Sequence, residues 1–223
     1  MKLVAILGSP RGMKGNTGTL LDGVLQGAEA AGAKIELFSL AEKNVQPCVS
    51  CERCHVVGDC GIHDDFGTIL EAMKTADGLV LASPNYIMSV TAQMKAFLDR
   101  CSGPIHTQVF DGKYAAVVTT SGSPSDGAME QYVERALSII GYYTVGSVNA
   151  VGWQMGDVER RAPHMAAAEA LGRLLVNAIS TCQVSPEQAI EREMIMERFQ
   201  QLVTMQKDHW KYEYEFWKAR TGR

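Results

Sequence analysis

Short apolar runs and amphipathic stretches take turns along the first two thirds of this chain. The short runs are typical of buried strands in a parallel sheet, and they cover residues 2–7, 34–39, 78–82, 114–120 and 142–151. Between them, apolar side chains recur at helical spacing, which predicts helices over residues 16–31, 65–76, 91–101 and 127–140. This alternation favours a doubly wound α/β fold, in which helices cover both faces of a five-stranded parallel sheet.

The pattern changes after Gly156, where the strand signals stop. Helical spacing predicts two further helices, over residues 157–182 and 186–219, with Ser185 and Pro186 at the start of the second. That second helix would be about 50 Å long. It carries one apolar stripe, formed by Phe199, Val203, Trp210, Tyr214 and Trp217. Because so long a helix exceeds what one small sheet can cover, we expect the stripe to contact a second subunit rather than its own domain.

Composition narrows the class of protein. The chain has 223 residues, of which 46% are hydrophobic and 21% charged, as expected of a folded globular protein. Its net charge of −4 argues against a nucleic-acid-binding protein, which needs a basic surface. No apolar run approaches the ~20 residues of a membrane span, and the N-terminus reads as a strand rather than a signal peptide. We therefore expect a cytoplasmic protein that does not enter a membrane.

The loop after the first predicted strand has the composition of a phosphate site. It is rich in glycine and leads into a helix, so free backbone amides and the helix N-terminus can both face an anion. It matches neither the Walker A pattern nor the Gly-x-Gly-x-x-Gly fingerprint of dinucleotide sites. What remains suits a dianionic monophosphate, with hydroxyl, amide and guanidinium groups from Ser9, Arg11, Asn16 and Thr17.

Two other polar loops follow predicted strands and reach the same edge of the sheet. One is residues 83–86, after the third strand, and the other is residues 121–123, after the fourth. In a doubly wound sheet, ligands bind beyond the carboxyl ends of the strands, where the strand order reverses. Three polar loops at that edge therefore predict one ligand site.

Several motifs together resemble the flavodoxin-like NAD(P)H-dependent FMN reductase family. They span residues 1–150 in order and are Gly8-Ser9-Pro10-Arg11, Gly15-Asn16-Thr17, Ala82-Ser83-Pro84-Asn85-Tyr86 and Ala92-Gln93-Met94-Lys95-Ala96-Phe97-Leu98-Asp99-Arg100. The resemblance implies a flavodoxin-like fold that binds FMN, with NAD(P)H as a candidate co-substrate. It implies an FMN phosphate held by Ser9, Arg11, Asn16, Thr17 and Gly18. It implies an isoalloxazine ring against Pro84, Asn85, Tyr86, Ile87, Ser121, Gly122 and Ser123, although Asn85 replaces an apolar residue frequent in relatives.

Four of the six cysteines fall within 13 residues, and their spacing fits an iron–sulfur cluster. They are Cys48, Cys51, Cys54 and Cys60, in the pattern Cys-x2-Cys-x2-Cys-x5-Cys. Closely spaced thiolates can each bind one iron of a [4Fe–4S] cluster. Within the flavin family, this loop resembles that of the iron–sulfur flavoproteins, which carry one [4Fe–4S] cluster and one FMN per subunit. Because the loop follows the second strand, we expect it to lie close to the flavin site, within the subunit or across an interface.

Three alternatives for these cysteines stay open: a zinc site made of the four thiolates or of thiolates with His55 or His63, a loop that holds no metal, and a redox disulfide. The other two cysteines, Cys101 and Cys182, lie on helical patterns and are expected to be buried. His106 and His164 are expected to be structural, and no side chain is assigned a catalytic role.

These observations predict a two-part chain and a redox function. Residues 1–152 form the flavodoxin-like FMN-binding domain, with a cysteine-rich loop at 47–61, and residues 153–223 form a helical extension. We expect an oxidoreductase that couples one-electron transfer from a ferredoxin-type donor to two-electron reduction of a small acceptor, with NAD(P)H as the alternative electron donor. The alternatives are an NAD(P)H-dependent FMN or quinone reductase without a cluster, and a non-enzymatic flavin electron carrier. The expected assembly is a homodimer or homotetramer.

Overall fold

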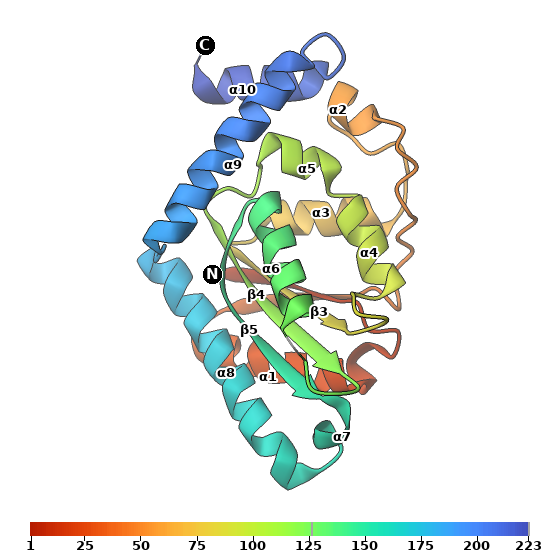
Figure 1. Cartoon of the computed structure of the whole chain (residues 1–223), viewed down its shortest axis with the longest axis vertical. Helices are drawn as coiled ribbons and strands as arrows, with labels where there is room; N and C mark the ends of the chain where they lie inside the picture. Colours follow the sequence, from red (N-terminus) through yellow and green to blue (C-terminus); the bar gives the residue numbers. More distant parts are fainter. Residues whose placement is uncertain (126, 223) are drawn as a thin grey trace.

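Five parallel strands form one sheet in the order β2-β1-β3-β4-β5 (Figure 1). The structure, a computed structural model, describes residues 1–125 and 127–222. The strands are β1 (Lys2–Leu7), β2 (Lys34–Ser39), β3 (Gly78–Pro84), β4 (Lys113–Ser121) and β5 (Tyr142–Val151). This is the flavodoxin-like order, and the switch point between β1 and β3 is where such sheets bind ligands. The predicted fold class is confirmed.

Helices cover both faces of the sheet, and each face has its own apolar core. Alternate residues of β1 divide between the two cores: Val4 and Ile6 face one, while Leu3, Ala5 and Leu7 face the other. The helices of the first layer are α3 (Asp65–Thr75), α4 (Ala92–Asp99) and α6 (Ala128–Ile140). Those of the second are α1 (Asn16–Ala30) and α8 (Val158–Thr181).

The crossing of α1 and α8 is close because each helix presents a glycine to the other. A Cβ atom at Gly27 would lie 2.0 Å from the carbonyl oxygen of Glu169, and one at Gly172 would lie 2.0 Å from that of Val24. Thus α8, which the sequence analysis assigned to the extension, packs directly on α1 and the sheet. The division of the chain into two domains stays a prediction.

The C-terminal region contains two helices where the sequence predicted one. Ser185 and Pro186 do begin α9 (Pro186–Met205), and the Ser185 hydroxyl accepts a hydrogen bond from the Gln188 amide. The helix ends at Met205, however, and α10 (Lys211–Thr221) starts after a turn, so the prediction of one helix over 186–219 is wrong. The remaining short elements, which the sequence analysis did not predict, are η1 (Gly12–Lys14), α2 (Arg53–Val57), α5 (Ser102–Thr107) and α7 (Gly152–Met155).

The apolar stripe of this region packs on its own chain. Phe199, Val203 and Trp217 are buried and form a small third core with Ile105 of α5. The turn before α10 makes this possible, because it folds α10 back over α5 and α2 (Figure 1). The length argument for a subunit contact therefore does not hold, and the oligomeric state stays a prediction.

Candidate functional site

A polar cleft of about 300 Å³ lies at the carboxyl edge of the sheet, at the switch point. It collects most of the residues that the sequence pointed to: Ser9, Arg11, Asn16, Thr17, Pro84, Asn85, Tyr86, Ser121 and Gly122. Gly15, Thr120 and Gly152 also line it and were not predicted. Gly18, Ile87 and Ser123 are not among the lining residues. The three predicted loops thus do meet around one cleft.

The first turn of α1 is suited to an anion because its backbone amides lack a side-chain cap. The N-cap residue is Gly15, which offers no side-chain acceptor, and the first turn carries no acidic residue. Uncapped amides and the helix dipole both favour a negative group at this position. The Arg11 side chain is exposed at the cleft and adds a positive charge.

The polar side chains of this turn bind mainly to the protein itself. Asn16 donates from Nδ2 to the carbonyl of Gly152 at 2.8 Å, and the hydroxyls of Thr17 and Thr120 are 2.6 Å apart. These contacts join α1 to the ends of β4 and β5. Gly18 has a packing role, since a Cβ there would lie 2.5 Å from the Cα of Met13. The residue types were predicted, but here they shape the loop and leave its amides free.

The loop after β3 forms a tight hairpin at the rim of the cleft. Tyr86 and Ser89 form an antiparallel bridge, in which the Tyr86 amide donates to Ser89 at 2.8 Å. Between them, Ile87 and Met88 have φ values of 50° and 63°, and Ile87 is 96% exposed. A left-handed backbone is strained for a β-branched residue such as Ile87. Its side chain faces solvent at the rim, and the ring contact that the resemblance implied for Ile87 stays a prediction.

The four clustered cysteines surround a separate pocket of about 100 Å³. Cys48 and Cys51 are exposed, Cys54 and Cys60 are half-buried, and none is in a disulfide. Soft thiolate ligands gathered in this way suit iron–sulfur clusters and zinc. The predicted grouping of these side chains is therefore present.

Arg100 holds the cysteine loop through buried hydrogen bonds, a role that was not predicted from the sequence. It is 4% exposed, and its Nε donates to the Sγ of Cys60 at 3.2 Å. Its other nitrogens donate to the carbonyls of Gln46 and Ile62 and bidentately to Asp64. Burial by itself would raise the pKa of the Asp64 carboxyl, but the hydrogen bonds from Arg100 and from backbone amides lower it. One guanidinium thus spans both ends of the loop.

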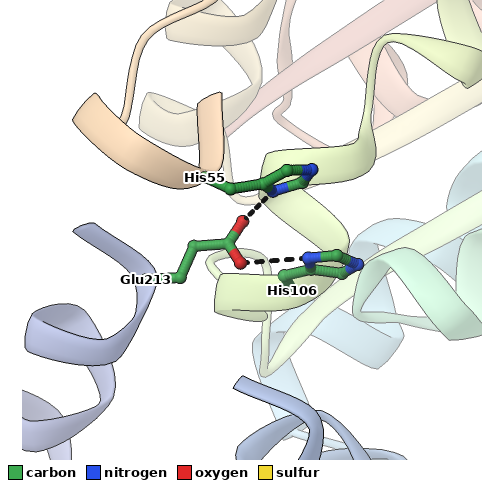
Figure 2. A group of neighbouring side chains, drawn as sticks. All are labelled: His55, His106 and Glu213. Carbon is green, nitrogen blue, oxygen red and sulfur yellow. Dashed lines mark hydrogen bonds and ion pairs between the residues drawn. The ribbon is translucent and has the colours of Figure 1, made fainter. Parts of the chain in front are cut away.

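A buried carboxylate from α10 joins the cysteine loop to α5 (Figure 2). Glu213 is completely buried and accepts from the Nδ1 of His55 at 2.5 Å and from the Nδ1 of His106 at 3.0 Å. The imidazoles are stacked with their centroids 4.7 Å apart, and Trp210 covers both. Burial would lower the pKa of His55, but its bonds to Cys54 and Glu213 outweigh burial and raise it to about 10. Burial would raise the pKa of Glu213, but its hydrogen bonds from His106 and His55 outweigh burial and lower it, which favours the ionised carboxylate.

The cleft and the cysteine pocket lie at opposite ends of α4 and share no lining residue. Thr91 caps this helix at the cleft end and donates to the carbonyl of Gly8 at 2.7 Å. Arg100 follows the other end and holds the cysteine loop. Eight helical residues span about 12 Å. The two sites are therefore separate pockets, and the expected closeness of cluster and flavin, within the subunit or across an interface, stays a prediction.

The two remaining cysteines differ. Cys101 is buried as expected, and burial raises the pKa of its thiol to about 12. Cys182 is exposed at the end of α8, so the expectation that it is buried is wrong.

Fold and cleft together define a flavin-dependent oxidoreductase of flavodoxin-like architecture. The family model for NADPH-dependent FMN reductases matches residues 1–154, and the chain belongs to this family, in the group of iron–sulfur flavoproteins. FMN is accordingly the cofactor that its family supports. In the part of the chain that the structure describes, no helix has the length and apolar character needed to cross a membrane.

Three comparisons illustrate these relationships. An iron–sulfur flavoprotein of Archaeoglobus fulgidus is 32% identical over 99% of both chains. An iron–sulfur flavoprotein of Methanocaldococcus jannaschii is 35% identical over 68% of this chain and 76% of its own. The NAD(P)H:quinone oxidoreductase from Methanothermobacter marburgensis has a TM-score of 0.61 at 19% identity, covering 78% of this chain and 96% of its own, which shows a shared fold.

Proposed function

We propose that this protein is an FMN- and [4Fe–4S]-dependent oxidoreductase that couples one-electron transfer from a ferredoxin-type donor to two-electron reduction of a small acceptor. The observation that carries the proposal is the gathering of Cys48, Cys51, Cys54 and Cys60 around one pocket in a flavin-reductase fold. The similar proteins from Archaeoglobus fulgidus and Methanocaldococcus jannaschii are iron–sulfur flavoproteins, which supports a cluster in this chain.

The grouping of possible ligand atoms favours a cluster over a single zinc ion at the cysteines. Four thiolates bound to zinc at about 2.3 Å stand roughly 3.8 Å from one another. Within residues 1–125 and 127–222, the only group of three His, Cys, Asp or Glu side chains placed to hold one ion is His55, His106 and Glu213, whose ligand atoms lie within 4.8 Å of one another. Each thiolate of a cluster binds its own iron, so the sulfurs can stand further apart. The stacked imidazoles, in turn, point side by side at one carboxylate (Figure 2), which suits hydrogen bonds better than a shared ion.

In the proposed reaction, this chain positions and tunes its cofactors. When bound, FMN supplies one- or two-electron chemistry and a [4Fe–4S] cluster supplies one-electron chemistry. The amides of the first turn of α1, with Arg11, would hold the FMN phosphate, and Pro84, Asn85, Tyr86, Ser121 and Gly122 would border the ring. Arg100 would donate a hydrogen bond to the Cys60 thiolate, a contact of the kind that sets cluster potentials.

Anaerobic purification followed by iron, sulfide and FMN assays tests the cluster. Cys54→Ala should lose iron and keep FMN, while Cys182→Ala should keep both, because Cys182 is exposed elsewhere. Near-zero iron and sulfide in protein handled without oxygen would contradict the cluster and favour the alternative function, an NAD(P)H-dependent FMN or quinone reductase without a cluster. Bound zinc with little iron would favour a zinc site. If NADPH reduces the flavin at turnover rates, NADPH rather than a ferredoxin-type protein is the electron donor.

Substitution in the first loop tests the phosphate assignment. Arg11→Ala should weaken FMN binding about tenfold, the expected loss for one charge-assisted contact. Lys14→Ala is the matched control, because Lys14 is an exposed cation of the same loop that does not line the cleft. Equal affinities of the two variants in a fluorescence titration with FMN would remove Arg11 from the site. We further propose that the protein is cytoplasmic and forms a homodimer or homotetramer. Light scattering of the purified protein can check the oligomeric state.

A further inference from the structure

A second pocket borders the cysteine loop and shares no lining residue with the flavin cleft. Its volume is about 160 Å³, and it lies between the cysteine loop, α3, α5 and α10, partly open to solvent. Cys54, Cys60 and Arg100 line both this pocket and the cysteine pocket. One layer of side chains therefore separates the two. The C-terminal extension contributes one wall of the pocket, formed by Tyr212 and Phe216 of α10.

Two glycines keep this space open. A Cβ at Gly103 would lie 3.3 Å from the Cβ of Cys54, so a larger residue there would push against the pocket wall. At Gly58 a Cβ would lie 2.4 Å from the ring of Tyr212, and the φ of +79° also favours glycine. Gly58 thus allows the Tyr212 ring to pack over the end of α2.

The lining favours an apolar and uncharged molecule. Phe66, Leu70 and Val109 contribute from the protein body and the two aromatic rings of α10 from the other side. Arg100 has no donor left for a ligand, because its nitrogens serve Cys60, Asp64 and backbone carbonyls. The Lys74 ammonium at the pocket is paired with Glu71 at 2.7 Å. A negatively charged ligand would therefore find its neighbouring cations already neutralised.

The volume sets the size of the occupant. Cavities of about 150 Å³ lined by apolar side chains hold one benzene ring. Drug-sized or fused-ring molecules need roughly 300 Å³ or more. Aromatic walls add favourable ring-to-ring contacts for a flat occupant.

We propose that the pocket between the cysteine loop and α10 is a binding site for a neutral molecule with a single aromatic or quinonoid ring. Such a molecule would lie against Cys54 and Cys60 and outside the flavin cleft. The proposal concerns binding and does not depend on which metal the cysteines hold.

Ligand-observed fluorine NMR on the purified holoprotein with saturating FMN tests this site, with 4-fluorophenol as the probe. Wild-type protein should bind the probe saturably. Leu70→Trp and Val109→Phe, which fill the pocket from two different elements, should each weaken binding at least tenfold. Ile190→Trp is the matched control, because Ile190 is 61% exposed on α9 and is not part of the pocket. Circular dichroism confirms that each variant is folded.

A comparison of ligands with one and two rings independently tests the wall of the pocket that α10 forms. Wild-type protein should bind 6-fluoro-2-naphthol at least tenfold more weakly than 4-fluorophenol, whereas Phe216→Ala should bind the two about equally, because the loss of one wall makes room for a second ring. Absence of saturable 4-fluorophenol binding to the wild type overturns the proposal. It is also overturned if Leu70→Trp or Val109→Phe is folded and binds 4-fluorophenol with wild-type affinity. The same holds if Phe216→Ala shows the same preference between 4-fluorophenol and 6-fluoro-2-naphthol as the wild type.

Discussion

Alanine at Gly27 is a sharp test of how α8 joins the rest of the molecule. The added Cβ would lie 2.0 Å from the carbonyl oxygen of Glu169, a backbone atom that cannot rotate away. Atoms at this distance overlap, so α1 and α8 must move apart by roughly 1 Å. Buried side chains along the crossing, among them Val24, Ala168 and Leu175, would lose contact together.

The size of the effect follows from that displacement. A gap of up to 1 Å removes a quarter to a half of the dispersion energy of the facing atoms. Overpacking of a core usually costs about 1–3 kcal/mol, and a clash between two backbones belongs at the upper end, near 3 kcal/mol. Against a total stability of about 5–15 kcal/mol this is large, and it corresponds to a fall in Tm of roughly 6–12 °C.

Guanidinium denaturation followed by circular dichroism measures the change in the free energy of unfolding. The matched control is Gly67→Ala on α3, where a Cβ would meet nothing within 4 Å. That variant should be more stable by about 0.5–1 kcal/mol, because alanine has the higher helix propensity. If Gly27→Ala lies within about 0.5 kcal/mol of the wild type, the close crossing is refuted, and with it the place of α8 in the core.

Three further predictions concern the cysteine loop and α10. In protein loaded with the proposed cluster, Arg100→Lys keeps the positive charge but loses the hydrogen bond from Nε to the Cys60 sulfur. The reduction potential of the cluster, measured by an EPR-monitored redox titration, should therefore become more negative by about 60 mV per 1.4 kcal/mol of lost hydrogen bonding. An unchanged potential would show that this bond does not tune the cluster. Because the pKa of Asp64 is lowered in the fold, its contribution to stability is present above about pH 3.9 and is lost as the pH falls through the folded pKa. Asp64→Asn should therefore flatten the acid dependence of the unfolding free energy below pH 3.9, and a curve parallel to the wild type would contradict the assignment. Glu213→Gln replaces one carboxylate oxygen with an amide NH2, which cannot accept the hydrogen bond from an imidazole N–H, so amide hydrogen exchange in α10 should become at least tenfold faster. Glu215→Gln, at an exposed position of the same helix, should exchange at the wild-type rate. Equal exchange rates in both variants would show that Glu213 does not hold the helix.

Patterns that are local in the sequence predicted the sheet well. A buried parallel strand is apolar on both faces, so β1 and β4 stand out as short apolar runs. The end of α9 was missed for the opposite reason. The apolar spacing from Phe199 to Trp217 continues across the turn at residues 206–210, because side chains on both helices face the same small core. Periodicity alone cannot distinguish one long helix from two short ones that share a core.

The candidate site was predictable in its residue types and less so in its contacts. Loops that follow adjacent strands must meet at one edge of the sheet, which is why Ser9, Asn85 and Ser121 could be brought together from the sequence. Where each side chain points depends on distant partners. Asn16 bonds to Gly152, 136 residues away, and so supports the loop itself.

The contact between His55, His106 and Glu213 lies beyond any local pattern, because it joins α2, α5 and α10 over as many as 158 residues. The family match ends at residue 154, so the family alone says nothing of α10. Yet α10 supplies the carboxylate that pairs with His55, next to Cys54, and the rings that form one wall of the pocket beside Cys60. Without Glu213, the buried Nδ1 of His55 would lose its carboxylate acceptor, at a cost of about 1–3 kcal/mol. The sequence of α10 is therefore coupled to that of the cysteine loop, and a relative with another residue in place of Glu213 should also differ at His55.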